Sequence, residues 1–377
     1  MLMGRRCAKA WRTLLVIIIT HCSLLIPHYC RAQGFTFVEL NAENLFDTSH
    51  DSLKNDADWL PDGRQRWTPA RYWRKVNHVA QELLACVGDG LPDLVALVEV
   101  ENDSVLHALT RRSLLRSAGY EYLMTESPDV RGIDVALLYQ PLSFRPLCYD
   151  ALSVVPLPGM RPTRDILYVQ GETLHHTHGG AGAAGAAGAA GATGAAGFLR
   201  RDTLHVFVVH APSRFGGEAR TRPFRRQVAE RLAAAVDALP AGARIIVAGD
   251  FNDPADAPAL QFLEQHGLHN ITRHAPALRS APGAAARRSD ALRSAAGDSA
   301  VDVRGTYRYQ GRWESIDHIL VSAPLVGAVE QAAVLAAPFL LEADGRHGGR
   351  RPRRTYVGPR YQRGFSDHLP LIVRFRR

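Results

Sequence analysis

Three short stretches of this 377-residue chain are apolar at every position, and each runs directly into an acid or a histidine. They are LVALV at 94–98, VFVV at 206–209 and IIVAG at 245–249. A strand with water on one face alternates apolar and polar side chains, whereas a strand covered on both faces is apolar throughout. These stretches are therefore expected to be buried strands.

Other segments supply the remaining strands and the helices. Strand patterns occupy 35–46, 132–140, 165–176, 198–210, 314–322 and 368–376, and helical patterns cover about 71–86, 104–118 and 221–239. Helices interspersed with strands in this way predict a mixed α/β (α+β) fold. We expect one domain over residues 33–377.

The first 32 residues have the layout of a secretory signal peptide. A basic start precedes the apolar core Leu14–Ile26, and Cys30-Arg31-Ala32 offers small residues at a cleavage site before Gln33. The alternative is an uncleaved anchor, but a span needs about 20 apolar residues and this core is shorter and interrupted. We therefore expect a secreted or periplasmic protein with no stable membrane span after cleavage.

Net charge and cysteine content exclude few classes of function. The chain carries a net charge of +8, and removing the five basic residues of 1–32 leaves +3. Overall basicity is thus weak evidence for a nucleic-acid partner. Only Cys86 and Cys148 remain after cleavage. Two cysteines are no disulfide framework, and whether they pair is left open.

Two segments look like insertions rather than structure. Residues 179–197 form a Gly/Ala repeat without side chains that could build a core, and its flanks read as the two strands of a hairpin. Residues 275–303 are rich in Ala, Arg and Ser and are also expected to be a flexible loop.

The polar residues at the strand ends carry the chemistry. One such ending is commonly a turn or a cap, but six of them in one chain favour a site. Carboxylates without cysteines favour a hard divalent cation such as Mg²⁺. Amides and histidines can hydrogen-bond to phosphate oxygens, and an Asp–His pair can hold an imidazole in one orientation. Together these types predict hydrolysis of a phosphate ester. The residues are Asn41, Glu43, Glu99, His210, Asp250, Asn252, Asp317, Asp367 and His368.

The ordered set of motifs resembles the endonuclease/exonuclease/phosphatase superfamily, with its DNase I-like or exonuclease III-like fold. GDFND and SDH are the most specific pieces, and the set covers nearly all of 35–375. The pieces are LNAENLFD, LVALVEVEN, RGIDVALLY, VVHAPSRFGG, IVAGDFND, SIDHILVS and GFSDHLPL. The resemblance implies a four-layer α/β/β/α sandwich, two mixed sheets flanked by helices, and a divalent-metal-dependent phosphoesterase using Mg²⁺ or Mn²⁺.

The resemblance also assigns roles. Asp250 would orient or deprotonate water, and Asp317 would orient His368. Asn41, Asn252 and His210 would brace the site or contact the phosphate. Glu43, Glu99 and Asp367 would bind or flank the metal. Asp253 ends GDFND but lies outside the core pattern of the family, and it is interpreted as a turn residue.

The substrate is less constrained than the reaction. Arginines follow the His210 strand, and among them Arg214 and Arg222 are candidates for phosphate binding. The alternative is that they lie on a solvated surface. These arginines and the resemblance favour a phosphodiester of nucleic acid and a nuclease. A lipid head group or an inositol phosphate is the alternative substrate. A catalytically silent binding module is a further alternative, although the chain keeps every matched residue.

Overall fold

The computed structural model describes residues 34–88, 90–176, 199–280 and 303–376. The predicted signal peptide, the Gly/Ala repeat and most of 275–303 lie outside these residues. Ala277–Leu278, at the start of that last segment, form a short strand, β10. No helix among the described residues is long and apolar enough to cross a membrane.

Two large sheets form the centre of the molecule. The first has the strand order β10, β14 (Val329–Leu335), β19 (Leu371–Phe375), β1 (Phe35–Leu45), β2 (Leu94–Val100), β4 (Asp134–Tyr139) and β3 (Glu121–Met124). The second has the order β5 (Phe144–Leu152), β6 (Ile166–His176), β7 (Leu199–His210), β8 (Ile245–Asp250), β13 (Asp317–Ser322) and β9 (Leu268–Asn270). Both are mixed, because β1 pairs with β2 and β7 with β8 in parallel while most other pairs are antiparallel.

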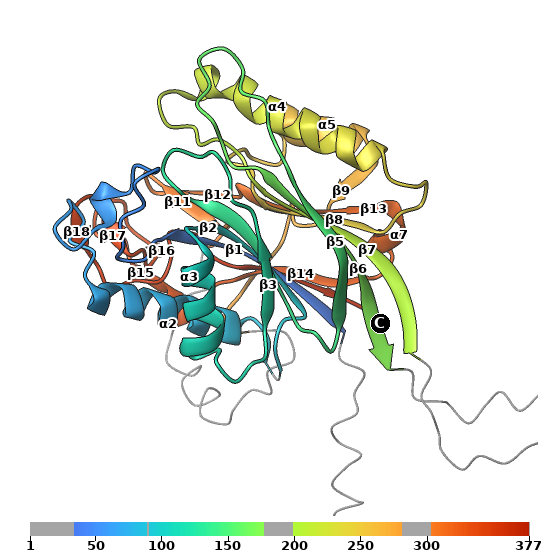
Figure 1. Cartoon of the computed structure of the whole chain (residues 1–377), viewed down its shortest axis with the longest axis horizontal. Helices are drawn as coiled ribbons and strands as arrows, with labels where there is room; N and C mark the ends of the chain where they lie inside the picture. Colours follow the sequence, from blue (N-terminus) through green and yellow to red (C-terminus); the bar gives the residue numbers. More distant parts are fainter. Residues whose placement is uncertain (1–33, 89, 177–198, 281–302, 377) are drawn as a thin grey trace, which may run out of the picture.

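Helices cover the outer faces of the sheets (Figure 1). Helix α2 (Pro69–Ala85) and α3 (Asp103–His107) lie on the side of the first sheet, and α4 (Glu218–Asp237) and α5 (Pro258–Gln265) lie on the side of the second. Shorter helical turns are η2 (Ala57–Trp59), η3 (Ala108–Arg112), α7 (Ala323–Val326) and η4 (Pro338–Leu340). This is the expected four-layer sandwich.

The helix expected over 104–118 is shorter than predicted. It runs only through α3 and the π-helical turn η3, ending at Arg112. Ser113 explains the end, because its hydroxyl donates to the carbonyl of Leu109 and accepts from the amide of Leu115 at 3.0 Å. A serine that bonds the nearby backbone in this way competes with helix continuation.

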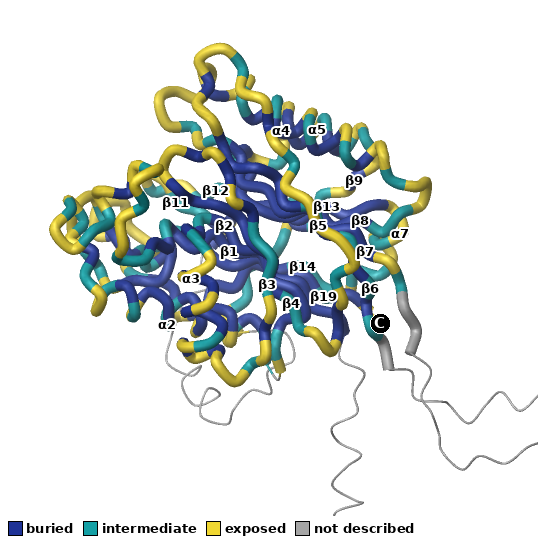
Figure 2. Tube along the Cα trace, in the orientation of Figure 1, coloured by how far each residue is buried: buried dark blue, intermediate teal, exposed yellow. Residues whose placement is uncertain are grey.

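Strand β7 shows why its apolar run is continuous. Val206 and Val208 belong to the core cluster that the first sheet shares, while Phe207 and Val209 belong to the cluster beneath α4 and α5. Successive side chains of a strand point to opposite faces, so both faces must be apolar when both are covered. Figure 2 shows the resulting buried interior between exposed loops.

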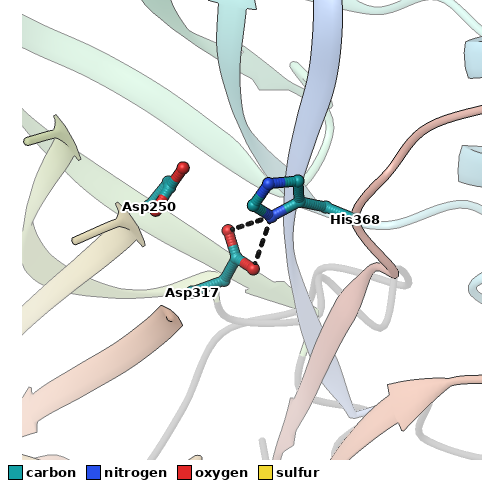
Figure 3. Close-up of side chains that lie close together, drawn as sticks. All are labelled: Asp250, Asp317 and His368. Atoms are coloured by element: carbon teal, nitrogen blue, oxygen red, sulfur yellow. Dashed lines mark hydrogen bonds and ion pairs between the residues drawn. The ribbon is translucent and has the colours of Figure 1, made fainter. Parts of the chain in front are cut away.

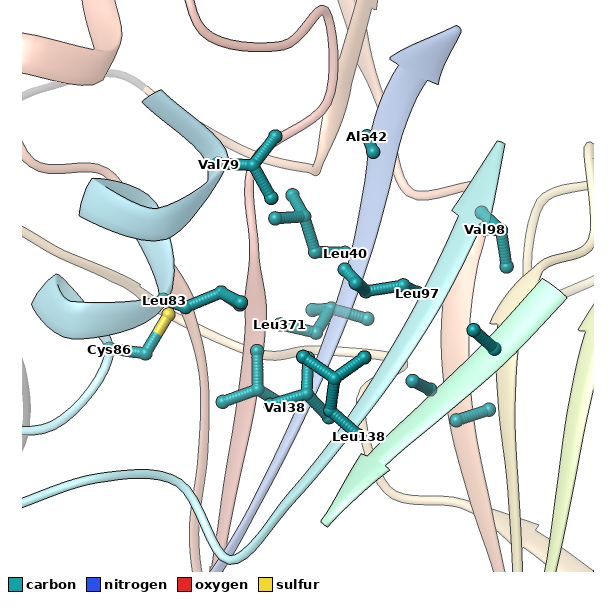
Figure 4. Packing of buried hydrophobic residues seen from close by; sticks show 14 of the residues in the cluster. Val38, Leu40, Ala42, Val79, Leu83, Cys86, Leu97, Val98, Leu138 and Leu371 are labelled. Carbon is teal, nitrogen blue, oxygen red and sulfur yellow. The ribbon is translucent and has the colours of Figure 1, made fainter. Parts of the chain in front are cut away.

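Helix α2 closes the other outer face. Figure 4 shows Val79 and Leu83 of α2 pointing toward Leu40 of β1. Cys86 follows the helix as a buried free thiol, and Cys148 is an exposed free thiol on β5. The two cysteines are therefore not paired with each other.

Three small hairpins extend one end of the sandwich. They are β11–β12 (Tyr307–Tyr309 and Arg312–Glu314), β15–β16 (Leu341–Ala343 and Arg350–Pro352) and β17–β18 (Tyr356–Val357 and Arg360–Tyr361). The last of these lies in residues 353–365, which we call the 353–365 segment.

In the first long loop Trp67 is buried and donates to the carbonyl of Phe46 at 2.9 Å, so this tryptophan packs the loop.

Candidate active site

Strand direction brings the polar strand ends together. Strands β7 and β8 are parallel, so His210 and Asp250 are register partners at their carboxyl ends. Strand β13 runs antiparallel to β8, which places its first residue, Asp317, opposite Asp250. In the first sheet, β1 and β2 are parallel and carry Asn41 and Glu99 toward their carboxyl ends. One edge of the sandwich thus collects residues from both sheets.

Asp250, Asp317 and His368 form a compact buried cluster, which we call the strand-end group. One candidate ligand atom from each of the three lies within 4.8 Å of the others. Figure 3 shows His368 pointing toward Asp317, with Asp250 beside them. Nδ1 of His368 donates to the two carboxylate oxygens of Asp317 at 2.8 and 3.0 Å. Thr306 donates its hydroxyl to the same carboxylate, so Asp317 fixes the orientation of the imidazole.

His368 is held in its charged form. Burial by itself would lower its pKa, but the Asp317 carboxylate, with Asp367 and Asp250, outweighs burial and raises the pKa well above the ordinary value. Ser366 fixes the backbone here, because its hydroxyl accepts from the amide of His368 at 3.1 Å and donates to the carbonyl of Asn41 at 2.7 Å. A positively charged donor with a fixed position results.

Asp250 is poised between its two protonation states. Burial and the neighbouring Asp317 raise its pKa to about 7, against the opposing charge of His368 and the amide of Asn252. Its Oδ2 accepts from Nδ2 of Asn41 at 3.1 Å, and its Oδ1 accepts from the amide of Asn252 at 2.7 Å. A carboxylate with a pKa near 7 suits general-base chemistry at neutral pH.

His210 joins the strand-end group to Glu99. Its Nε2 lies 3.6 Å from Oε1 of Glu99 and 3.8 Å from Oδ2 of Asp250. Its Nδ1 is buried and has no hydrogen-bond partner among the described residues. Burial, together with the cations Arg164 and Arg131, lowers the pKa of His210 well below its ordinary value. His210 is therefore neutral at pH 7.

The other predicted metal positions lie around this cluster. Both carboxylate oxygens of Glu43 accept backbone amides, from Thr355 at 2.6 Å and Tyr356 at 3.4 Å, and Lys75 Nζ lies 3.6 Å away. The Glu43 carboxylate is thus occupied by the 353–365 segment, and its metal role stays a prediction. Asp367 is half-buried, with its Oδ1 3.9 Å from Nε2 of His368.

The two predicted phosphate-binding arginines have other partners. Arg214 forms an ion pair with Glu314. Arg222 is exposed on α4 and pairs with Glu218 at 3.2 Å, one helical turn away. Asn252, by contrast, lies within the site, where its Nδ2 donates to the carbonyl of Ala211 at 3.1 Å.

Unusual backbone conformations concentrate at the strand ends. Glu43, Asn44, Glu99 and Asn252 have φ values of 50°, 54°, 63° and 52°, in the left-handed region that side chains disfavour. Such conformations cost of order 1–3 kcal/mol each and persist where the surroundings enforce them, commonly at functional sites. Gly249 has a φ of 146°, and a Cβ there would lie 1.8 Å from the carbonyl oxygen of Val209. Only glycine allows β8 to approach β7 so closely.

Asp253 is more than a turn residue. Its carboxylate is buried and pairs with Nε of the buried Arg225 at 2.7 Å, and its carbonyl lies 2.9 Å from Nε2 of His318. The turn after β8 is thereby tied to α4. The sequence interpretation overlooked this contact because the two partners are far apart in the chain.

Sequence analysis also missed several buried polar residues. Glu39 is fully buried, both carboxyl oxygens lack hydrogen-bond partners, and burial, then Asp317 and Asp250, raises its pKa well above the ordinary value. An acid inside the apolar run FVEL was the available signal. Arg164 is buried and donates to Asp129 at 3.1 Å and to the carbonyl of Ala211 at 2.9 Å. No local motif marked it.

Comparison with known proteins identifies the family. The family model described as "Endonuclease/Exonuclease/phosphatase family" matches residues 36–178 and 193–377, and the chain belongs to this family. No curated protein sequence matches the chain.

Solved structures agree on the fold. An endonuclease/exonuclease/phosphatase from Bacteroides vulgatus has a TM-score of 0.51 at 14% identity, covering 91% of this chain and 98% of that chain. A family protein from Bacteroides thetaiotaomicron has a TM-score of 0.50 at 15% identity, covering 91% and 97%. A mannosyl-6-phosphatase from the same species has a TM-score of 0.50 at 16% identity, covering 91% and 99%.

The expected superfamily and fold are thus confirmed. The chain is a phosphoesterase of the endonuclease/exonuclease/phosphatase superfamily, whose members use divalent metals.

Proposed function

We propose that this protein is a Mg²⁺-dependent phosphodiesterase that cleaves nucleic acid. The observation that carries the proposal is the strand-end group: a charged His368 fixed by Asp317, beside an Asp250 whose pKa is about 7. A cation that donates and a carboxylate that accepts, placed a few ångströms apart, are the two groups that in-line hydrolysis of a phosphate ester requires.

The donor set fits a hard divalent cation. Glu99 uses Oε2 to accept the amide of Asn44 at 2.9 Å, while its Oε1 accepts no hydrogen bond from the described residues. Nε2 of His210 lies 3.6 Å from that Oε1, while Nδ1 of the same ring is buried and has no hydrogen-bond partner among the described residues. We propose Glu99 as the principal ligand, with Asp367 and Glu43 as the flanking acids. A Mg²⁺ ion at Glu99 would polarise the phosphoryl group and offset the excess of carboxylates.

The chain's own residues perform the remaining work. Asp250 accepts a proton from the attacking water, and Asn41 and the amide of Asn252 hold its carboxylate in place. His368 donates toward the phosphate from Nε2, because Asp317 occupies Nδ1. His210 is neutral, so it can contact the phosphate without adding a positive charge to the site. Preorganised donors of this kind provide most of the rate enhancement in such reactions.

The test of this function is a substrate panel. The purified chain is assayed on supercoiled plasmid, on sphingomyelin-type lipid and on inositol phosphates, with Mg²⁺ and with chelator. Nicking of plasmid that requires metal and is lost in Asp250→Ala and His368→Ala supports a nuclease. Nicking that persists in both variants indicates a contaminant and refutes the claim. Hydrolysis of only the lipid or inositol substrates moves the activity to that class.

We also propose that the protein is exported. The support is the basic start and apolar core of residues 1–32, which lie outside the described residues. Expression of the full chain followed by N-terminal sequencing tests the idea. A mature protein that begins at Gln33 in the exported fraction is expected, and an intact Met1 in the cytoplasm contradicts it.

A further inference from the structure

One arginine beside the strand-end group has no role in the chemistry described above. Arg354 lies in the 353–365 segment, with its Nη2 3.5 Å from Oδ2 of Asp367. Its guanidinium lies over the ring of Tyr307, 5.9 Å from the ring centroid. The Tyr307 ring in turn lies 4.8 Å from the ring of His368, tilted by 35°. Arg354, Tyr307 and His368 therefore form a continuous row that ends at the catalytic histidine.

The structure holds this arginine in place from behind. The two residues that follow it, Thr355 and Tyr356, donate their amides to the buried Glu43. Lys75 donates to the hydroxyl of Thr355 at 2.8 Å and to the carbonyl of Phe365. Gly364 passes so close that a Cβ there would lie 2.0 Å from the carbonyl oxygen of Arg354. The backbone of Arg354 is therefore anchored by buried charges, which is unusual for a loop.

The guanidinium itself is only loosely engaged. The Arg354 side chain is 24% exposed. Besides the ion pair with Asp367 at 3.5 Å it interacts with the hydroxyl of Tyr307, which leaves several of its five N–H donors available. By contrast, Arg164 and Arg225 are almost fully buried and have close acceptors. An anchored backbone that carries a partly exposed cation next to His368 is suited to bind an anion supplied by the substrate.

We propose that Arg354, with the Tyr307 ring beneath it, binds a second phosphate of the substrate next to the one that is hydrolysed. The proposal rests on the proposed phosphodiesterase function and deepens it. The substrate class becomes phosphodiesters with a flanking phosphate, such as successive nucleotides of a strand, over esters with a single phosphate. The Tyr307 ring offers a surface for the sugar or base between the two phosphates.

The experiment compares three dinucleotides in Mg²⁺: TpT, which has one phosphate, and pTpT and TpTp, which each have a second phosphate at one end. For the wild-type chain we expect kcat/KM for pTpT or TpTp to exceed that for TpT by about 10- to 100-fold, the range of a hydrogen bond between charged groups. Arg354→Ala should abolish this preference, so that kcat/KM falls further for the preferred substrate than for TpT. Arg354→Lys should restore part of it, because lysine keeps the charge without the planar fork.

Arg360→Ala is the matched control, because it removes the same charge from an exposed position of the same segment. It should keep the preference. Two outcomes would overturn the proposal. In the first, Arg354→Ala keeps the preference of the wild type. In the second, all three rates fall equally in that variant at unchanged melting temperature. If the wild-type chain cleaves none of the three, nor plasmid, the proposed function itself fails and this inference falls with it.

Discussion

Two groups of buried charges lie near β1, and they are stabilised in different ways. In the strand-end group, burial and then the neighbouring Asp317 raise the pKa of Asp250 to about 7, and Asp317 has mainly His368 and Thr306 as partners. In the second group, Lys75, Glu43 and Glu82 lie under the 353–365 segment, and Lys75 and Glu43 have close partners. The first group keeps its charge available for a ligand, whereas the second uses its charge to fix backbone.

The largest effect is expected in the strand-end group. His368→Ala should lower kcat by about 10³-fold, because the imidazolium acts on the reaction. The variant also leaves the buried Asp317 without its cation, so stability should fall as well, and kcat is compared below the melting temperature of the variant. Steady-state rates and thermal unfolding measure the two effects.

The paired variant sharpens this test. Asp317→Asn combined with His368→Ala should be within a few-fold of His368→Ala alone, since the aspartate acts mainly through the histidine and otherwise only raises the pKa of Asp250. Rates that multiply would show that Asp317 has a separate function.

The second group should respond mainly in stability. Lys75→Met leaves the buried Glu43 carboxylate without its cation, and breaking a buried pair in this way costs about 3–5 kcal/mol. Urea unfolding measures the loss. The double variant Glu43→Gln, Lys75→Met should regain part of it. A loss below about 1 kcal/mol would mean that Lys75 does not anchor the segment.

The buried Glu82 should make the free energy of unfolding depend on pH. It is buried, neither carboxylate oxygen has a hydrogen-bond partner among the described residues, and burial raises its pKa from 4.5 to about 8. The native state thus holds a proton that the unfolded chain releases, so this residue lowers stability as pH rises from about 4.5 to 8.

Glu82→Gln removes that dependence. The variant should match the wild type near pH 4.5 and exceed its unfolding free energy by a few kcal/mol at pH 9, on the order set by the pKa difference. The exposed Glu230→Gln, whose partner is Arg226, should change little at either pH. A variant that gains nothing at pH 9 would show that Glu82 is ionised at no cost.

The smallest effect belongs to a charge outside both groups. Arg222→Ala should change the unfolding free energy by at most about 0.5 kcal/mol and kcat/KM by less than twofold, because an exposed pair with Glu218 is screened by water. A tenfold loss of kcat/KM at unchanged stability would instead support the phosphate-binding role predicted from sequence.

The burial of the central strands followed from the sequence, whereas the four layers were implied by the family resemblance. The continuous apolar run of β7 required cover on both faces, and the structure supplies it from the other sheet and from α4 and α5. The end of the helix at Arg112 did not follow, because it depends on how the Ser113 side chain bonds the backbone. Propensity alone does not reveal that competition.

The candidate site was likewise predictable only in part. Asp250 ends β8, Asn41 lies in the second half of β1, and His368 shortly precedes β19. Strand direction brings these positions to one edge of the sandwich. The direction of the Glu43 carboxylate could not be predicted, because it depends on the left-handed backbone at that residue and on partners more than 300 positions away. Arg164 and Glu39 were hidden for a related reason: their significance comes from neighbours on other strands and loops.

The bond from Ser366 to the carbonyl of Asn41 joins residues that are 325 positions apart. Contacts of such long sequence separation form late, because the entropy of closing the chain must be lost before they contribute. In a refolding experiment, far-ultraviolet circular dichroism should therefore recover before hydrolysis does. Regained activity then reports the docking of β19 beside β1, so the time course of activity measures the last step of folding.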